Sequence, residues 1–229
     1  MQKVKTLNIR FKNNITKEEI PVFRSALISS LKENNDVLFH NHIENGFRYA
    51  YPLIQYKRIN KKAAIFCIQQ GTDVIGKLFS TCNFTFHFNN KKVEMEIESI
   101  KASQHIIQTW EHSFDYKIRK WLPLNQDNYN KYLLLDALTD KIAFLENILI
   151  ANILSLSKGL NIYYDKEVQC TIQTCSEPAL TQYKEVKMMA FDIEFKSNVS
   201  LPDYIGLGKG VSLGMGVVTR KREKQNENK

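Results

Sequence analysis

The stretch VKTLNIRFKNNITKEEIPVFRSALISSLKEN, residues 4–34, changes its hydrophobic period once along its length. Its first eight residues alternate apolar and polar side chains, which is typical of a β-strand. Thr16 and Glu19 then have the spacing of a capping box at the start of a helix, although Pro21 leaves the first helical residue open. Apolar side chains recur at helical spacing after it, at Ile20, Phe23, Ala26, Leu27 and Leu31. The stretch therefore predicts a strand followed by a helix.

The next residues continue this alternation of elements. FRYAYPLIQYKR (47–58) and KAAIFCIQQ (62–70) have the composition of two strands. GTDVIGKLFSTC (71–82) predicts a short helix, and FTFHFNNKKVEMEIES (84–99) predicts a hairpin with a two-residue Asn-Asn turn. The resulting order, β-α-β-β-α-β, is that of a ferredoxin-like fold.

The second half of the chain repeats this order more loosely. FDYKIRKWLPL (114–124) predicts a strand, and residues 125–156 predict two helices. EVQCTIQTC (167–175) and VKMMAFDIEFK (186–196) predict two further strands, and GVVTR (216–220) predicts a last short one. We therefore predict an α+β protein of two tandem ferredoxin-like (RRM-like) modules.

We place the first module at residues 1–110 and the second at 111–220, joined near residues 111–114. Residues 221–229, KREKQNENK, contain no apolar side chain and predict a disordered basic tail. Residues 1–110 carry 16 Lys and Arg against 9 Asp and Glu, whereas residues 111–218 carry 11 against 13. A basic half beside a nearly neutral half indicates a face for a polyanion, most commonly nucleic acid. A lysine-rich solvated surface is the alternative.

Neither a membrane nor an oxidising compartment is indicated. The N-terminal residues alternate charged and apolar side chains, so we expect no signal peptide. The most apolar run (141–160) is interrupted by Glu146, Asn147 and Asn152, so it predicts a buried helix with no membrane partner. Four cysteines form no CxxC pair, which predicts reduced thiols in the cytoplasm and no zinc site.

Five of the nine glycines lie in GLGKGVSLGMG, residues 206–216. Their spacing fits neither a Walker loop nor a dinucleotide-binding fingerprint. The loop leaves backbone N–H groups unshielded around Lys209, so it is suited to approach a phosphodiester backbone closely. A glycine hairpin without a ligand is the alternative. The glycines predicted to lie against such a backbone are Gly206, Gly208, Gly210, Gly214 and Gly216.

Two of the five histidines, His40 and His42, lie just ahead of a basic, tyrosine-rich strand. The letters HNH do not indicate an HNH nuclease, whose motif is dispersed over a metal-binding fold. Histidine exchanges protons near neutral pH, so the pair suggests acid–base chemistry. A metal site that includes Glu44 is the alternative, although the spacing is not a recurrent zinc pattern. On the strand that follows, Gln55, Lys57 and Arg58 are candidate RNA contacts.

Two segments resemble signatures of one protein superfamily. LPDYIGLGKGVSLGMGVV (201–218) is similar to the C-terminal signature of the RAMP superfamily of CRISPR-associated proteins. FHNHIENGFRYAYPLIQYK (39–57) is similar to the active-site region of the b-type branch of its repeat-cleaving endoribonucleases. The resemblance covers nearly the whole chain. It implies metal-independent cleavage of CRISPR precursor RNA within its repeats, without a cofactor, by attack of a ribose 2′-hydroxyl that leaves a 2′,3′-cyclic phosphate and a 5′-hydroxyl.

The resemblance also implies a set of catalytic residues. His40 and His42 would transfer protons, Lys32 would stabilise charge on the phosphate, and Tyr49 would position the ribose or share in proton transfer. Lys32 near a helix C-terminus also complements the helix dipole, and Tyr49 is in phase with core aromatic residues, so both have structural alternatives.

The implied partner is CRISPR repeat RNA, and the resemblance is also compatible with effector-complex proteins and a homodimer as partners. The competing function is a non-catalytic RNA-binding subunit of an effector complex, which would not need the histidine pair. An RRM-like binder of single-stranded RNA is less favoured because no RNP motif is present.

Overall fold

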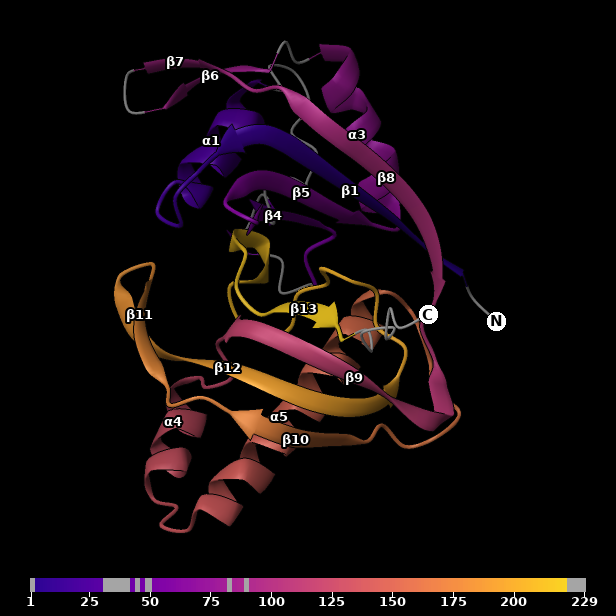
Figure 1. Cartoon of the computed structure of the whole chain (residues 1–229), viewed down its shortest axis with the longest axis vertical. Coiled ribbons are helices and arrows are strands. Elements are labelled where there is room, and N and C mark those ends of the chain that lie inside the picture. The colour runs from indigo at the N-terminus through magenta and orange to yellow at the C-terminus, as the bar shows by residue number, and fades with distance from the viewer. Residues whose placement is uncertain are drawn as a thin grey trace, which may run out of the picture. The chain divides into compact units, whose positions relative to one another are not determined.

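The computed structural model describes residues 3–30, 42–43, 46–47, 51–81, 84–88 and 91–221 (Figure 1). Contacts divide the chain into two units. The first is Met1–Ile106 with Gly210–Gly214, and the second is Ile107–Lys209 with Met215–Lys229. The junction predicted at residues 111–114 therefore lies inside the second unit, where these residues belong to a strand.

The first unit is a four-stranded antiparallel sheet with two helices. Its elements are β1 (Lys3–Asn14), α1 (Ile20–Ser30), the short strands β2 (His42–Ile43) and β3 (Gly46–Phe47), β4 (Ile54–Ile59), β5 (Lys62–Ile68), α3 (Gln70–Thr81), β6 (Thr85–Phe88), β7 (Lys91–Glu94) and β8 (Ile97–Ile106). The sheet order is β4-β5-β1-β8. Without the two short hairpins this is the predicted βαββαβ arrangement.

The strand predicted to continue to residue 99 is divided in two. β7 ends at Glu94, and Met95 is buried in the core while its N–H donates to the carbonyl oxygen of Phe84 at 2.8 Å. The fourth strand of the sheet is therefore β8, and the β6–β7 hairpin is an addition to it. Period-2 alternation continues across this break, so the sequence pattern did not reveal it.

One face of the first sheet packs against α1. Ile9 and Phe11 of β1 are fully buried, and the Phe11 ring lies edge-on to Phe23 of α1 with centroids 5.6 Å apart. One of the two hydrogen bonds of the predicted capping box is present ahead of α1: the Glu19 carboxylate accepts from the Thr16 backbone N–H at 2.7 Å. Pro21 is in the first turn of the helix, where its missing N–H costs nothing.

The second unit has the same strand order, but no α-helix lies between its last two strands. Its elements are β9 (Thr109–Trp121), α4 (Gln126–Leu133), α5 (Leu138–Gly159), β10 (Cys170–Cys175), β11 (Ala179–Tyr183), β12 (Val186–Val199) and β13 (Val217–Arg220). The 3-10 turn η1 (Val211–Leu213), between β12 and β13 in the chain, belongs by its contacts to the first unit. The sheet order is β10-β12-β9-β13, and β11, which the sequence did not predict, pairs with β12. The glycine-rich loop with η1 stands where a ferredoxin-like module has its second helix, since glycine is a poor helix former.

Helix α5 provides much of the second core. It alone among the described helices has the length and apolarity to cross a bilayer. One side of it is buried in the unit, however, at Leu145, Ile148, Leu149, Ile153 and Leu156. Asn152, which interrupts the apolar run, accepts a hydrogen bond from the buried Trp121 indole at 2.9 Å. This packing is that of a core helix.

Candidate functional site

The predicted catalytic segment is described only at one short hairpin. Lys32, His40 and Tyr49 lie outside the described residues. The backbone of His42 is in β2, which pairs antiparallel with β3 so that His42 is opposite Phe47. The catalytic roles of these four residues therefore stay predictions.

The three RNA contacts predicted on β4 do not share one face. Arg58 is two residues after Tyr56 on the strand, so the two side chains point to the same face of the sheet. The Tyr56 ring contacts Phe23 of α1, so this face is the one that α1 covers. Its Nε donates to the carbonyl oxygen of Ile15 at 2.6 Å. Gln55 and Lys57 are on the opposite side, and neither has exposed surface. A side chain that contacts RNA must be reachable from solvent, so contacts at Gln55 and Lys57 stay a prediction that needs this face to open.

Lys57 is a fully buried amine on β4. It pairs with Ala64 of β5, and its Nζ lies 6.0 Å from the centroid of the Phe66 ring. The described residues offer Nζ no hydrogen-bond partner. Burial lowers the pKa of the Lys57 ammonium to about 7. Lys57 therefore changes charge near neutral pH, and an anion brought beside it would hold the proton on.

Gln55 also keeps an unused polar group in this face. Its Nε2 donates to the Tyr51 hydroxyl at 2.8 Å and to the carbonyl oxygen of Pro52 at 3.0 Å. These bonds orient the amide and leave its Oε1 without a hydrogen-bond partner among the described residues. A buried acceptor and a buried amine two residues apart are costly unless something else satisfies them.

The glycine-rich loop needs glycine for its own packing. Gly216 has φ +61°, and a Cβ there would lie 1.8 Å from the carbonyl oxygen of Leu207. Gly214 has φ +75°, and a Cβ there would lie 3.1 Å from the carbonyl oxygen of Tyr56 on β4. These glycines therefore have a structural role whether or not the loop binds RNA.

The remaining predicted loop residues differ in their exposure. Gly206 is buried and bridges to Val217 of β13, while Gly208 and Gly210 are half-buried. Lys209 is exposed, and its backbone N–H donates to the carbonyl oxygen of Leu122 at 3.1 Å. Lys209 is thus held by its backbone and free to present its ammonium group to solvent.

The exposed face of the second sheet pairs its charges across strands. Glu194 of β12 lies 3.1 Å from Lys117 of β9 and 2.8 Å from Lys221. The hydrogen bonds from Lys221 and then Lys117 hold the pKa of the Glu194 carboxyl below its ordinary value. Lys196 and Asp115 are directly opposite, 4.0 Å apart. Cations paired in this way offer a polyanion little net attraction.

Neither the cysteines nor the acidic residues suggest a metal centre in the described part of the chain. Cys67 and Cys170 are buried free thiols, and burial raises the pKa of Cys170 to about 12. No cluster of three or more His, Cys, Asp or Glu side chains is placed to hold an ion within the described ranges. The metal alternative at His40, His42 and Glu44 rests on side chains outside those ranges.

Comparison with known proteins places both units in one family. Residues 2–106 match the model of the Cas6b N-terminal domain, and residues 108–221 match that of the Cas6b C-terminal domain. An uncharacterised protein of Methanocaldococcus jannaschii, MJ0978, is 38% identical over 114 residues, which are 49% of this chain and 76% of that protein.

Solved structures share the fold. A crystal structure of Cas6b has a TM-score of 0.85 at 25% identity, covering 96% of this chain and 100% of the other. A crystal structure of the CRISPR RNA processing endoribonuclease Cas6b has a TM-score of 0.75 at 23% identity, with the same coverage. Csf5, a type IV Cas6 crRNA endonuclease, has a TM-score of 0.57 at 11% identity, again covering 96% and 100%. The prediction of two tandem ferredoxin-like modules is confirmed.

Proposed function

The chain belongs to the Cas6b family, and we propose that it is an endoribonuclease that cleaves CRISPR precursor RNA within its repeats to release mature CRISPR RNAs. The observation that carries this proposal is that family models of both Cas6b domains match the chain, one in each half. A structure with the same fold is of a CRISPR RNA processing endoribonuclease. We propose that the protein acts in the cytoplasm.

The chemistry proposed is metal-independent transesterification. A 2′-hydroxyl attacks the adjacent phosphate, its proton passes to a base, and an acid protonates the departing 5′-oxygen. A cation beside the phosphate stabilises the charge that develops in the transition state. His40 and His42 supply the base and the acid, and Lys32 supplies the cation.

The choice of these residues rests on the family resemblance, in which Tyr49 positions the ribose or shares in proton transfer. Around these residues the structure describes only the short hairpin in which the backbone of His42 pairs with that of Phe47.

RNA binding is assigned first to the predicted residues that solvent reaches. Lys209 is exposed on the glycine-rich loop, and Arg58 is half-buried at the edge strand β4. The loop glycines allow the backbone around Lys209 to come close to phosphate groups. Gln55 and Lys57 would contact RNA only after their face of the sheet opens.

The test is cleavage of a labelled repeat RNA in the presence of EDTA. Wild-type protein is compared with His40→Ala and His42→Ala, and a control RNA carries a 2′-deoxy group at the cut site. We expect one cut that survives EDTA, fails on the deoxy RNA and is lost in both variants. Tight binding without a cut would favour a non-catalytic effector-complex subunit, and loss of the cut in EDTA would favour a metal site.

Oligomeric state forms a separate part of the proposal. We propose effector-complex proteins and a second copy of the chain as further partners, as the family resemblance allows. Light scattering after size-exclusion chromatography, with and without repeat RNA, measures the mass of the complex. A mass of one chain per RNA would contradict the homodimer.

A further inference from the structure

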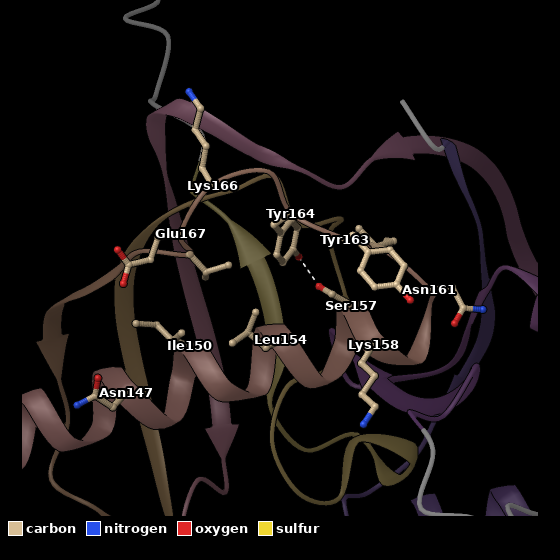
Figure 2. Close-up of a pocket in the computed structure, with 12 residues that line it drawn as sticks. Asn147, Ile150, Leu154, Ser157, Lys158, Asn161, Tyr163, Tyr164, Lys166 and Glu167 are labelled. Carbon is tan, nitrogen blue, oxygen red and sulfur yellow. Dashed lines mark hydrogen bonds between the residues drawn. The ribbon is translucent and has the colours of Figure 1, made fainter.

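A pocket of about 820 Å³ opens in the second unit, between one side of α5 and the segment at residues 161–168 that follows it (Figure 2). None of the residues predicted from the sequence as catalytic or RNA-binding lines it. Its volume is within the range of about 300–1,000 Å³ typical of ligand pockets. The size is that of a site for a small ligand or for one unit of a polymer.

One wall of the pocket is rigid. The Ser157 hydroxyl donates to the carbonyl oxygen of Ile153 at 2.9 Å, so the Tyr164 hydroxyl is the donor in the Tyr164–Ser157 hydrogen bond. Burial raises the pKa of the Tyr164 phenol to about 12, so it stays neutral. The Tyr164 ring is therefore held in place without a ligand, which reduces the entropy that binding must overcome.

The open side of the pocket presents apolar surface to water. Tyr163 is 91% exposed and Leu154 is 47% exposed. No hydrogen bond, ion pair or ring contact joins Tyr163 to another described residue. A tyrosine ring left free beside an apolar floor is a surface on which a flat ring can stack.

The polar groups around this surface favour a nucleotide over an apolar ligand. Lys158 and Lys166 lie at opposite edges of the pocket with their ammonium groups directed outward, and Asn147 and Asn161 lie at its two ends (Figure 2). A wholly apolar ligand would leave these amides and ammonium groups without partners. A nucleotide has partners for both kinds of group, because its base edge bonds an amide and its phosphates attract cations.

The charges of the pocket permit an anion near its edge. Its two lysines outnumber its single acid, Glu167. Lys166 forms an ion pair with Glu111, but the side chains are 47% and 86% exposed, so the pair is weak and exchangeable. Phosphates on either side of a bound base can therefore compete for Lys166 and reach Lys158.

We propose that this pocket binds one nucleobase of single-stranded RNA, stacked on Tyr163 above Leu154, with the flanking phosphates near Lys158 and Lys166. The inference rests on the proposed function and adds a binding site in the second unit to it. The site binds the RNA and takes no part in its cleavage.

The first test is the affinity of uncut, 2′-deoxy-blocked repeat RNA at fixed salt. Tyr163→Ala should raise Kd by about 5- to 150-fold, since stacking of one base contributes about 1–3 kcal/mol. Tyr163→Phe keeps the ring and should stay within about twofold. Lys158→Met should reduce the slope of log K against log salt by about 0.7, the effect of one phosphate contact, and Lys187→Met, at an exposed lysine outside the pocket, should leave the slope unchanged.

The second test separates this site from the proposed function. In a Tyr163→Trp variant, indole emission is followed while five-nucleotide single-stranded RNAs are added, and Leu154→Glu should abolish the quenching. Wild-type protein that cuts the repeat while Tyr163→Ala binds it equally well would overturn the pocket and leave the function standing. Quenching by short RNA in a protein that never cuts the repeat would support the pocket and contradict the proposed function. If neither variant changes RNA affinity but a peptide quenches emission, the groove is a protein-docking site.

Discussion

The two units share a strand order but treat their charges differently. On the exposed face of the second sheet, lysines face carboxylates across strands, as Lys117 and Lys221 do at Glu194. In the first unit, the sheet face away from α1 buries Lys57 with no hydrogen-bond partner among the described residues. The charges on the exposed face of the second sheet are thus paired with one another, whereas the buried face of the first sheet keeps the Lys57 amine, which a ligand could satisfy.

The two units also use the connection before their last strand differently. The first has a full helix there, α3, and the second has the glycine-rich loop, whose segment Gly210–Gly214 is grouped by its contacts with the first unit. A helix satisfies its own backbone groups and needs only one face buried. In the glycine-rich loop the backbone N–H groups of Leu207, Lys209 and Gly216 donate to the carbonyl oxygens of Gly216, Leu122 and Lys120. One topology therefore has a helix at this point in the first case and a loop held by backbone hydrogen bonds in the second.

The largest expected effect tests whether catalysis belongs to the first unit and not to the second. His42→Ala in the first unit should lower the single-turnover cleavage rate by about 10²- to 10⁴-fold, the usual worth of a general acid or base. His112→Ala, at an exposed histidine of the second unit, is the matched control and should change the rate by less than about twofold. Equal losses in the two variants would contradict the assignment of catalysis to the first unit.

Next in size is the effect of removing the buried amine. Lys57 has a pKa of about 7 in the folded protein against an ordinary value of 10.5. Between these values the unfolded chain binds more protons, so wild-type stability should rise with pH by roughly 1 kcal/mol per unit and level off below pH 7. Lys57→Met should remove this rise and be more stable at pH 7, by on the order of a few kcal/mol.

Urea unfolding measured at several pH values between 7 and 10 checks the Lys57 prediction. Lys187→Met, at an exposed lysine, is the control and should run parallel to wild type. A Lys57→Met curve that also runs parallel to wild type would mean that Lys57 keeps an ordinary pKa.

A smaller loss of stability tests the packing of the glycine-rich loop. Gly216→Ala puts a methyl group against the carbonyl oxygen of Leu207 at positive φ and should cost at least about 2 kcal/mol. Gly76→Ala is the matched control, because no atom lies within 4 Å of its added Cβ and alanine favours a helix. Thermal unfolding should show Gly216→Ala below wild type and Gly76→Ala at or above it, and the opposite order would refute the packing.

The smallest expected effect tests whether the paired charges on the second sheet weaken its attraction for RNA. Glu194→Gln releases Lys117 and Lys221 from their shared carboxylate. Exposed ion pairs contribute little, so the melting temperature should hardly change. Non-specific RNA affinity should rise by less than about threefold at low salt and lose this gain at high salt. A large gain that persists at high salt would show that the face of the second sheet is itself an RNA site.

Much of the fold was predictable because it depends on local patterns. The strand-to-helix change within residues 4–34 and the two helices within residues 125–156 follow from hydrophobic period alone. The break at Met95 and the extra strand β11 were missed, because period-2 alternation does not show where one strand ends and the next begins. Composition identified the glycine-rich loop, but it did not predict that the loop takes the place of a helix.

The pocket beside α5 had a weaker signal in the sequence. Two adjacent tyrosines, Tyr163 and Tyr164, follow the long helix, and nothing in the sequence distinguishes the one that is 91% exposed from the one that is buried against Ser157. Which of two neighbours faces the core depends on how the chain leaves the helix. That exit is set by packing between α5 and residues far from it in sequence.

The sequence by itself determined the order of the elements, the excess of basic residues in the first half and the two segments that resemble a family of RNA-processing enzymes. Each of these is a property of neighbouring residues or of composition. Only the tertiary structure decided that Lys57 is buried with a lowered pKa, that Glu194 pairs with two lysines, and that Tyr163 is exposed at a pocket. Burial and pairing depend on residues that folding brings together from distant parts of the chain, and no local pattern records them.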